Sequence, residues 1–259
     1  LGGLPPQVGW RVIERCLHVD PAQRYASASE LAAELDLLTA QVGGASDEFG
    51  NPYRGLRVFE RENSDVFMGR RTECYEVLER LRLSRCVVVA GDSGVGKSSL
   101  CRAGVLGRIA TGGLRDARLY RDATIVPGRH PVQSLLLQVG KILGQTSESL
   151  REVFSRSPTE LVRMLAQYAA ESRGVLLFFD QLEELLTQSN RDEVSLLGEF
   201  LLAYRQAHPG LQLLATVRAD FLTRLAALPF IGRALASNLY VLGPLSRAAL
   251  REAIASPCL

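Results

Sequence analysis

The sequence lacks an excess of charge, a long apolar run and a signal segment. Its 259 residues carry a formal net charge of +2, and the basic residues are spread along the chain instead of forming a polybasic cluster. Neither a nucleic acid nor a membrane surface is therefore indicated as a partner. The longest apolar runs have the length of strands, short of the roughly 20 residues that a membrane helix needs. The opening LGGLPPQVGW has no signal-peptide pattern. These absences favour a cytoplasmic protein.

Cysteine and histidine are scarce and scattered. The five cysteines are Cys16, Cys74, Cys86, Cys101 and Cys258. The three histidines are His18, His130 and His208. No two cysteines have CxxC or metal-like spacing, and no histidine lies near a cysteine that could complete a zinc site. The pattern predicts reduced thiols in a cytosolic protein and no zinc site.

What is present fits one full domain and a fragment of another. The chain is 47% hydrophobic and 22% charged, an ordinary balance for a globular protein. Residues 8–38 have apolar positions at helical spacing, interrupted at 20–24, and Ser27 or Ser29 could cap the second helix. Residues 41–52 are rich in glycine, serine and acids without apolar periodicity, which is typical of a linker.

These patterns predict three segments. We expect a helical fragment at 1–40, a linker at 41–50 and an α/β domain at 51–259. Both ends of the chain break off beside helical patterns. We therefore expect it to be an internal piece of a larger protein.

The longer segment alternates helical patterns with short apolar runs. Strands are predicted at 86–90, 117–126, 175–179, 211–217 and 239–242. Helices are predicted at 71–83, after 97, from 131, from 158, at 194–207 and from 246. Continuous valine, leucine and phenylalanine runs between helices are what a parallel sheet covered on both faces requires. The predicted fold class is α/β, with a central parallel sheet between two layers of helices.

Between the first strand and the next helix lies GDSGVGKSS, which fits the pattern G-x-x-x-x-G-K-[ST]. Its residues are Gly91, Asp92, Ser93, Gly94, Val95, Gly96, Lys97, Ser98 and Ser99. The glycines let backbone amides point at nucleotide phosphates, and the helix N-terminus adds its dipole. Lys97 would neutralise the β and γ phosphates, and the Ser98 hydroxyl would complete the Mg²⁺ shell. The alternative is an ordinary glycine-rich turn; the flanking strand and helix favour the P-loop.

A second apolar strand, VLLFF, runs directly into Asp180. Because ligands collect at the carboxyl ends of parallel strands, this aspartate would lie beside the Mg²⁺ ion of a P-loop nucleotidase. The buried strand before it would hold the carboxylate in place, and the cation would compensate its charge. Asp180 is therefore the predicted Walker B aspartate.

Two further acids follow it, Glu183 and Glu184. Either could orient and deprotonate an attacking water, which needs a carboxylate within one hydrogen bond of that water. Both could equally lie on a solvated helix face or pair with an arginine. We prefer Glu183 as the base.

A third strand, LQLLATVRADF, also ends in polar groups, which include Thr216, Arg218 and Asp220. An arginine at the carboxyl end of a strand next to the P-loop strand can reach a γ-phosphate and report its presence. We therefore propose Arg218 as a sensor. In the alternative, Arg218 pairs with Asp220 or with one of the acids after the second strand.

Together these motifs resemble the bacterial STAND NTPases, of AAA+-like fold, and among them the novel STAND type. The resemblance covers residues 51–259 and depends on the ordered set GDSGVGKSSLCRAGVL, VLLFFDQLEELLT and TVRADFL. DVFMGRRTE is similar to the family's opening motif, which would place Phe67, Gly69 and Arg70 near the adenine; in the alternative, Phe67 and Met68 belong to the core. VLGPLSRAALREAI is similar to the passage into the lid, where Pro244 would lie near the base or ribose, or be a plain turn proline.

The first segment has a resemblance of its own. VIERCLHVDPAQRYASASELAAEL is similar to the last helices of a bacterial Ser/Thr protein kinase of eukaryotic type, in which Arg24 would pair with a glutamate further upstream. The catalytic motifs of such a kinase are missing from the sequence, so this chain would not phosphorylate protein itself. A generic helical hairpin is the alternative.

The resemblance implies a signalling switch that binds ATP or ADP with Mg²⁺ and hydrolyses ATP slowly. It also implies nucleotide-dependent self-association and protein partners bound through further repeats. Two alternatives stay open: a non-hydrolysing scaffold that nucleotide merely stabilises, and the regulatory region of a protein whose main activity is that of a kinase. ATP is preferred to GTP because the family binds it and no NKxD-type guanine motif is found in the sequence.

Overall fold

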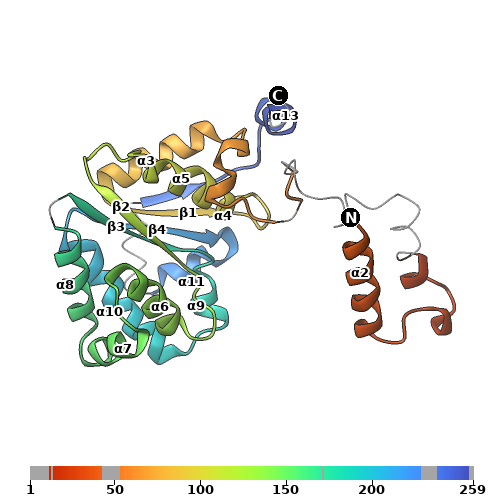
Figure 1. Ribbon diagram of the computed structural model, residues 1–259, viewed down its shortest axis with the longest axis horizontal. Coiled ribbons are helices and arrows are strands. Elements are labelled where there is room, and N and C mark those ends of the chain that lie inside the picture. The colour runs from red at the N-terminus through yellow and green to blue at the C-terminus, as the bar shows by residue number, and fades with distance from the viewer. Residues whose placement is uncertain are drawn as a thin grey trace. The chain divides into compact units, whose positions relative to one another are not determined.

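The fold is seen in a computed structural model, which divides into two units, residues 1–57 and 58–259 (Figure 1). The structure describes residues 12, 14–42, 53–55, 57–170, 172–228 and 238–256, with 36–42 described by their backbone alone. No helix among these residues is long and apolar enough to cross a membrane.

The first unit contains a short 3₁₀ turn, η1 (Pro21–Gln23), and a longer helix, α2 (Ala28–Val42). The turn falls where the helical pattern breaks, and the Asp20 side chain accepts a hydrogen bond from the Ala22 amide. Of the two predicted caps, Ser27 is the one observed, since its hydroxyl accepts from the Glu30 amide at 3.1 Å. The kinase-like origin of this unit stays a prediction.

Five parallel strands form the sheet of the second unit, in the order β2-β3-β4-β1-β5. In chain order the strands are β1 (Cys86–Gly91), β2 (Leu119–Ile125), β3 (Arg173–Phe179), β4 (Leu211–Arg218) and β5 (Leu239–Val241). The predicted strands are all present within about two residues of their predicted ends. β4 lies next to β1, as expected for a strand that carries a sensor residue.

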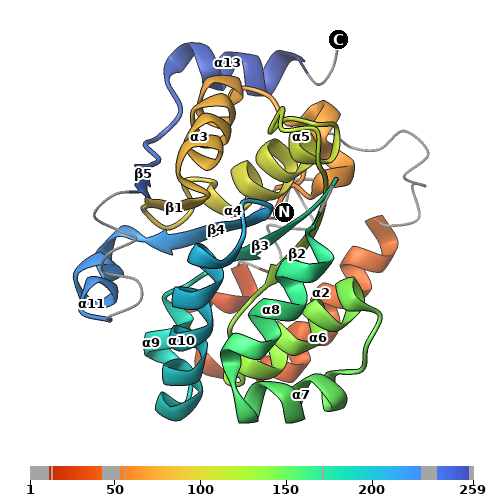
Figure 2. The same cartoon turned by 90° about the vertical axis from the view of Figure 1, so that its left-hand side faces the viewer.

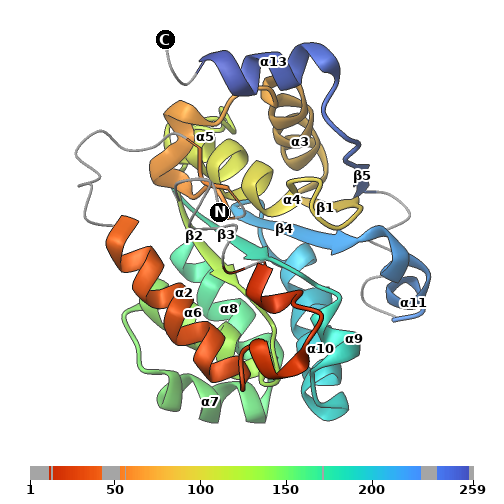
Figure 3. The ribbon, with the colours of Figure 1, turned by 90° about the vertical axis from the view of Figure 1, so that its right-hand side faces the viewer.

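Helices cover both faces of the sheet, as Figures 2 and 3 show from opposite sides. The helices of this unit are α3 (Arg71–Ser84), α4 (Lys97–Ser99), α5 (Gly107–Ala110), α6 (Pro131–Leu143), α7 (Ser147–Arg156), α8 (Pro158–Tyr168), α9 (Glu184–Thr187), α10 (Arg191–Ala207), α11 (Leu222–Ala226) and α13 (Arg247–Ala255). Three further helical segments are the 3₁₀ turns η2 (Arg61–Val66) and η4 (Ala219–Phe221) and the π-helical turn η3 (Leu100–Leu106). The three-layer α/β architecture is therefore confirmed. α7 was not predicted as a separate helix.

Alternate residues of the strands supply two separate cores. Val87 and Val89 of β1 face α3 and the helix that starts at Lys97, whereas Val88 and Ala90 face α6, α8 and α10. Because side chains alternate across a strand, a central strand covered on both faces must be apolar at every position. This explains why the central strands read as continuous apolar runs. Because all the strands are parallel, their carboxyl ends lie at one edge of the sheet.

Candidate nucleotide-binding site

The glycine-rich loop lies between β1 and α4. Gly94 and Gly96 have φ of +78° and +95°, a left-handed backbone that glycine adopts without strain. A Cβ on Gly91 would lie 2.6 Å from the carbonyl oxygen of Leu242, so the loop also packs closely against the segment after β5. The sequence predicted a backbone cradle here, and the loop has the conformation that such a cradle needs.

The Lys97 ammonium turns back toward this loop. It donates hydrogen bonds to the carbonyl oxygens of Gly91, at 2.9 Å, and of Asp92, at 2.8 Å. Its pKa is lowered from the ordinary lysine value because the group is partly desolvated, and the nearby carboxylates of Glu183 and Asp180 oppose this shift. The ammonium is thus a charged donor held at the rim of the cradle.

Asp180 follows β3 directly and is only 1% exposed. Its Oδ1 accepts hydrogen bonds from the hydroxyls of Ser98, at 2.7 Å, and Thr216, at 2.6 Å. Ser98 was predicted beside this carboxylate, and the structure brings the two side chains together. Thr216 had been noted without a role; it also accepts from the Gln181 amide at 2.9 Å, and so fixes the turn after Asp180.

Arg102 is the residue of this site that the sequence analysis missed. Its Nε and Nη2 donate to Oδ2 of Asp180 at 3.1 and 2.8 Å, and its Nη1 donates to Glu60 at 2.6 Å. It lies in the π-helical turn η3, four residues after Ser98. Residues four apart share one face of a helix, so this spacing was a usable signal.

These oxygens suit Mg²⁺. The ion prefers hard oxygen ligands and is usually held by one or two carboxylates, a hydroxyl and substrate phosphates, with water completing its shell. The Ser98 hydroxyl and the Asp180 carboxylate match that description. No cluster of three or more His, Cys, Asp or Glu that could hold a metal occurs among the described residues.

The two glutamates after Asp180 lie in different surroundings. Glu183 is 7% exposed, its Oε2 accepts from the Arg218 amide at 3.2 Å, and its charge acts on Lys97. Glu184 turns instead to the loop after β2, where it accepts from the Gly128 amide at 2.8 Å. Only Glu183 therefore faces the phosphate cradle, although its role as a base stays a prediction.

Arg218 lies at the end of β4, in register with Gly91 of the P-loop strand. Its guanidinium pairs with Asp220 at 2.8 and 3.0 Å, which is the alternative that the sequence analysis left open. The pair is solvent-exposed, at 44% and 57% for the two side chains, so it is weak and can exchange. The charge of Arg218 also lowers the pKa of Lys97. The role of Arg218 as a sensor stays a prediction.

Gly69 and Arg70, which the opening motif singled out, lie next to the P-loop, and Arg70 contacts it directly. Arg70 is 6% exposed and donates to the backbone carbonyl oxygens of Val95, at 3.1 Å, and Gly243, at 2.9 Å. It also pairs with Glu73 at 2.6 Å. The side chain thus clamps the P-loop to the segment that follows β5. A contact of Gly69 or Arg70 with adenine stays a prediction.

The profile of the family described as Novel STAND NTPase 1 matches residues 52–259. The chain belongs to this family. It is a P-loop NTPase module, and its AAA+-like fold agrees with the match. Among curated proteins none matches the sequence.

Two solved structures are similar to this NTPase at low sequence identity, and the likeness to the first, the one with a TM-score above 0.5, concerns the fold alone. The ORC1 protein of Aeropyrum pernix in complex with DNA is 16% identical, with a TM-score of 0.52, and the alignment covers 75% of this chain and 50% of that one. The Walker-type ATPase paby2304 of Pyrococcus abyssi is 18% identical, with a TM-score of 0.47, and the alignment covers 75% of this chain and 58% of that one. The NTPase thus spans about half the length of these proteins.

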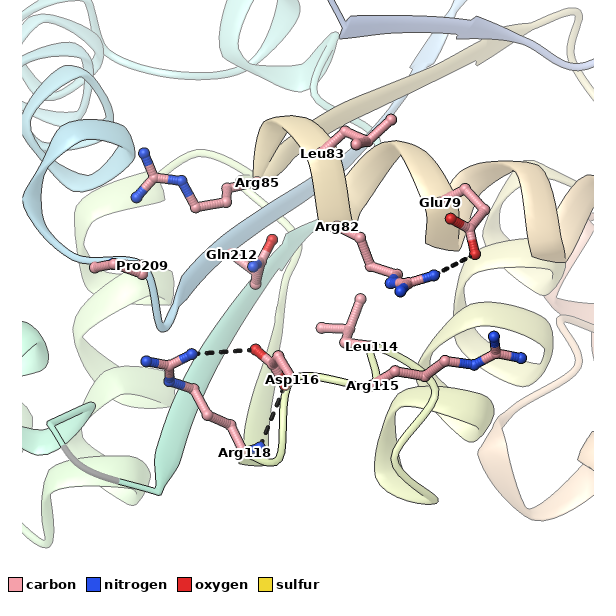
Figure 4. Close-up of a pocket in the computed structure, with 10 residues that line it drawn as sticks. All are labelled: Glu79, Arg82, Leu83, Arg85, Leu114, Arg115, Asp116, Arg118, Pro209 and Gln212. Atoms are coloured by element: carbon pink, nitrogen blue, oxygen red, sulfur yellow. Dashed lines mark hydrogen bonds and ion pairs between the residues drawn. The ribbon is translucent and has the colours of Figure 1, made fainter.

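A pocket at the opposite end of the sheet is a separate feature of the NTPase. It has a volume of about 380 Å³ and is lined by residues of α3, the loop before β2 and the start of β4 (Figure 4). Two of its arginines are already paired: Arg82 with Glu79 at 2.5 Å, and Arg118 with Asp116 at 3.4 Å. None of the P-loop residues lines this pocket.

Replacing Gly69 by alanine is expected to destabilise the NTPase by about 2–5 kcal/mol. Gly69 has φ of +80°, and a Cβ there would overlap the backbone carbonyl oxygen of Ala249 in α13. Both the strained backbone and the displaced helix contribute. Denaturant unfolding measures the effect. Gly144→Ala is the matched control, because Gly144 has φ of +68° but nothing within 4 Å of its Cβ position. Equal losses in the two variants would show that the contact with α13 contributes nothing.

Proposed function

We propose that this NTPase module is a switch that binds ATP or ADP with Mg²⁺ and hydrolyses ATP slowly. The observation that carries the proposal is the convergence of the P-loop, the Ser98–Asp180 pair and the buried Glu183 at one edge of the sheet. Hydrolysis of a nucleotide needs backbone amides and a cation site at the phosphates, and a carboxylate near the attacking water. At this edge of the sheet the P-loop would supply the amides, Ser98 and Asp180 the cation site, and Glu183 the carboxylate.

The P-loop would bind the nucleotide phosphates in the following way. Lys97 would leave the two carbonyl oxygens that hold it and bridge the β and γ phosphates, which compensate its charge better than neutral carbonyls do. Ser98 and Asp180 would hold Mg²⁺, which supplies charge neutralisation at the γ-phosphate.

Hydrolysis needs one residue to prepare the water and one to sense the γ-phosphate. Glu183 would accept the proton of the attacking water, because its carboxylate is buried and faces Lys97. Arg218 would exchange its exposed partner Asp220 for the γ-phosphate oxygens, and so report whether that phosphate is present. The Arg218 amide also donates a hydrogen bond to Glu183. A movement of Arg218 on loss of the γ-phosphate would therefore change the position of the base.

The wider role extends the same proposal. A signalling switch would couple the nucleotide state to self-association and to protein partners bound through further repeats, within a larger cytoplasmic protein that also contains a Ser/Thr kinase. The kinase-like residues 1–40 and the family resemblance support this arrangement. The preference for ATP over GTP also comes from the family resemblance.

Titration calorimetry with ATP and Mg²⁺, ADP and GTP tests the proposal. We expect binding that prefers adenine nucleotides and tightens when Mg²⁺ is added, and an Asp180→Ala variant that still binds ATP but no longer responds to Mg²⁺. The absence of binding to a folded protein, judged by circular dichroism, would contradict the switch. It would favour the scaffold alternative, in which the P-loop has only a structural role.

A further inference from the structure

Arg102 satisfies one whole side of the buried Asp180 carboxylate. Both hydroxyl contacts, from Ser98 and Thr216, go to Oδ1, whereas among the described residues only the Arg102 guanidinium donates to Oδ2, at 2.8 and 3.1 Å. A carboxylate that is 1% exposed needs a compensating cation, since an unpaired buried charge is strongly destabilising. Arg102 supplies that positive charge where a P-loop NTPase would otherwise use Mg²⁺.

Glu60 holds the other end of the same guanidinium. Its carboxylate accepts from Nη1 of Arg102 at 2.6 Å and is 42% exposed. The segment around Glu60 runs beside the helix that begins at Lys97, and the amide of Phe59 donates to the Ser99 hydroxyl at 3.1 Å. Arg102 is thus shared between a buried carboxylate at the nucleotide site and an exposed carboxylate outside it.

The two carboxylates have opposite effects on a metal ion at Asp180. A guanidinium and Mg²⁺ repel each other and compete for the same carboxylate, so Arg102 on Asp180 opposes metal binding. Glu60 is a second carboxylate that can pair with the guanidinium. When Mg²⁺ binds, the guanidinium can therefore leave Asp180 and keep its ion pair with Glu60. Removal of Arg102 should therefore ease Mg²⁺ binding, and removal of the Glu60 charge should hinder it.

We infer that Arg102 is a positioning residue that holds Asp180 ready and competes with Mg²⁺ for it, and that Glu60 sets the strength of this competition. The inference rests on the proposed function, because it concerns the cation that accompanies the nucleotide. Its consequence is that the Mg²⁺ concentration at which the module loads ATP is set by a residue outside the phosphate cradle.

The test is the Mg²⁺ concentration at half-maximal enhancement of ATP binding, measured by calorimetry on the whole chain. For Arg102→Gln we expect this midpoint to fall about 3- to 10-fold, since a buried charge competitor is removed. For Glu60→Gln we expect it to rise about 2- to 5-fold, the smaller effect of a half-exposed charge. A merely structural role of either residue would weaken binding without moving the midpoint in opposite directions.

Each matched control removes a charge of the same sign from a residue close in sequence to Arg102 or Glu60. Arg108→Gln removes an arginine of α5, the helix that directly follows η3, whose side chain donates to the Gly104 carbonyl oxygen, and Glu62→Gln removes an exposed acid of η2. Neither should move the Mg²⁺ midpoint by more than about the exposed-charge effect of twofold. If Arg102→Gln does not fold, Glu60→Gln decides alone, because it leaves the buried pair intact.

The possible failures are distinguishable. If the wild-type protein binds no nucleotide at any Mg²⁺ concentration, the proposed function fails. If it binds ATP with Mg²⁺ but the midpoints of both variants are unchanged or move in the same direction, the proposed function stands and the role of Arg102 and Glu60 is overturned. Opposite shifts, with both controls unchanged, support the inference.

Discussion

The Glu183→Gln variant is expected to hydrolyse ATP about 100- to 1000-fold more slowly than the wild-type protein while binding it with nearly unchanged affinity. Glutamine keeps the shape of the side chain, and its carbonyl oxygen can still accept the hydrogen bond from the Arg218 amide. It cannot take a proton from water. Phosphate release under saturating ATP measures the loss in kcat, and calorimetry measures the affinity.

Glu184→Gln is the control for this prediction. Its side chain accepts a hydrogen bond from the Gly128 amide, and a glutamine oxygen can accept the same bond. We expect hydrolysis within about threefold of the wild-type rate. A large loss in Glu184→Gln together with a normal rate in Glu183→Gln would reverse the assignment of the base. Equal small losses would show that neither carboxylate activates the water.

The Lys97→Ala variant is expected to bind ATP about 30- to 1000-fold more weakly, which corresponds to roughly 2–4 kcal/mol for lost charge-assisted hydrogen bonds. The fold should survive, because the ammonium contacts only two carbonyl oxygens at the rim of the loop and is partly exposed. Calorimetry with ATP and Mg²⁺ measures the affinity, and thermal unfolding without nucleotide verifies the fold.

The sequence offers one natural control. It contains two lysines, and the other, Lys141, contacts Gln138 on the surface of α6. Lys141→Ala should therefore bind ATP as the wild-type protein does. Unchanged affinity for ATP in Lys97→Ala would contradict the P-loop assignment. The glycine-rich turn would then have a structural role only. The two lysines also allow a chemical test, in which bound ATP protects only Lys97 from acylation.

Short-range patterns were enough for the elements and for the cradle. The run from Cys86 to Ser99 contains a strand, a glycine-rich turn and a helix start within one stretch of chain, so its geometry is almost wholly local. The same is true of the apolar run before Asp180, whose covered faces require apolar residues at every position. The helix boundary at α7 was missed because Pro158 offered the stronger helix-start signal nearby.

The hydrogen-bond and ion-pair partners of each site residue depend on the order of strands in the sheet. The spacing of residues along the sequence does not reveal that order. β4 inserts between β1 and β3, and this order places Thr216 beside Asp180 and Arg218 beside Gly91. The two glutamates are adjacent in sequence, yet the turn after Asp180 sends one toward Lys97 and the other toward Gly128. Whether Arg218 paired with Asp220 was likewise open until the structure was seen.

The sequence by itself therefore determined the fold class, the glycine-rich loop between strand and helix, and the acid that ends the second apolar strand, because each depends on residues a few positions apart. Only the tertiary structure decided that Arg70 clamps two backbone segments and that Arg102 bridges Asp180 and Glu60. Those contacts join residues 25 to 173 positions apart. They exist because the sheet gathers the carboxyl ends of its strands, and the segments before and after them, at one edge.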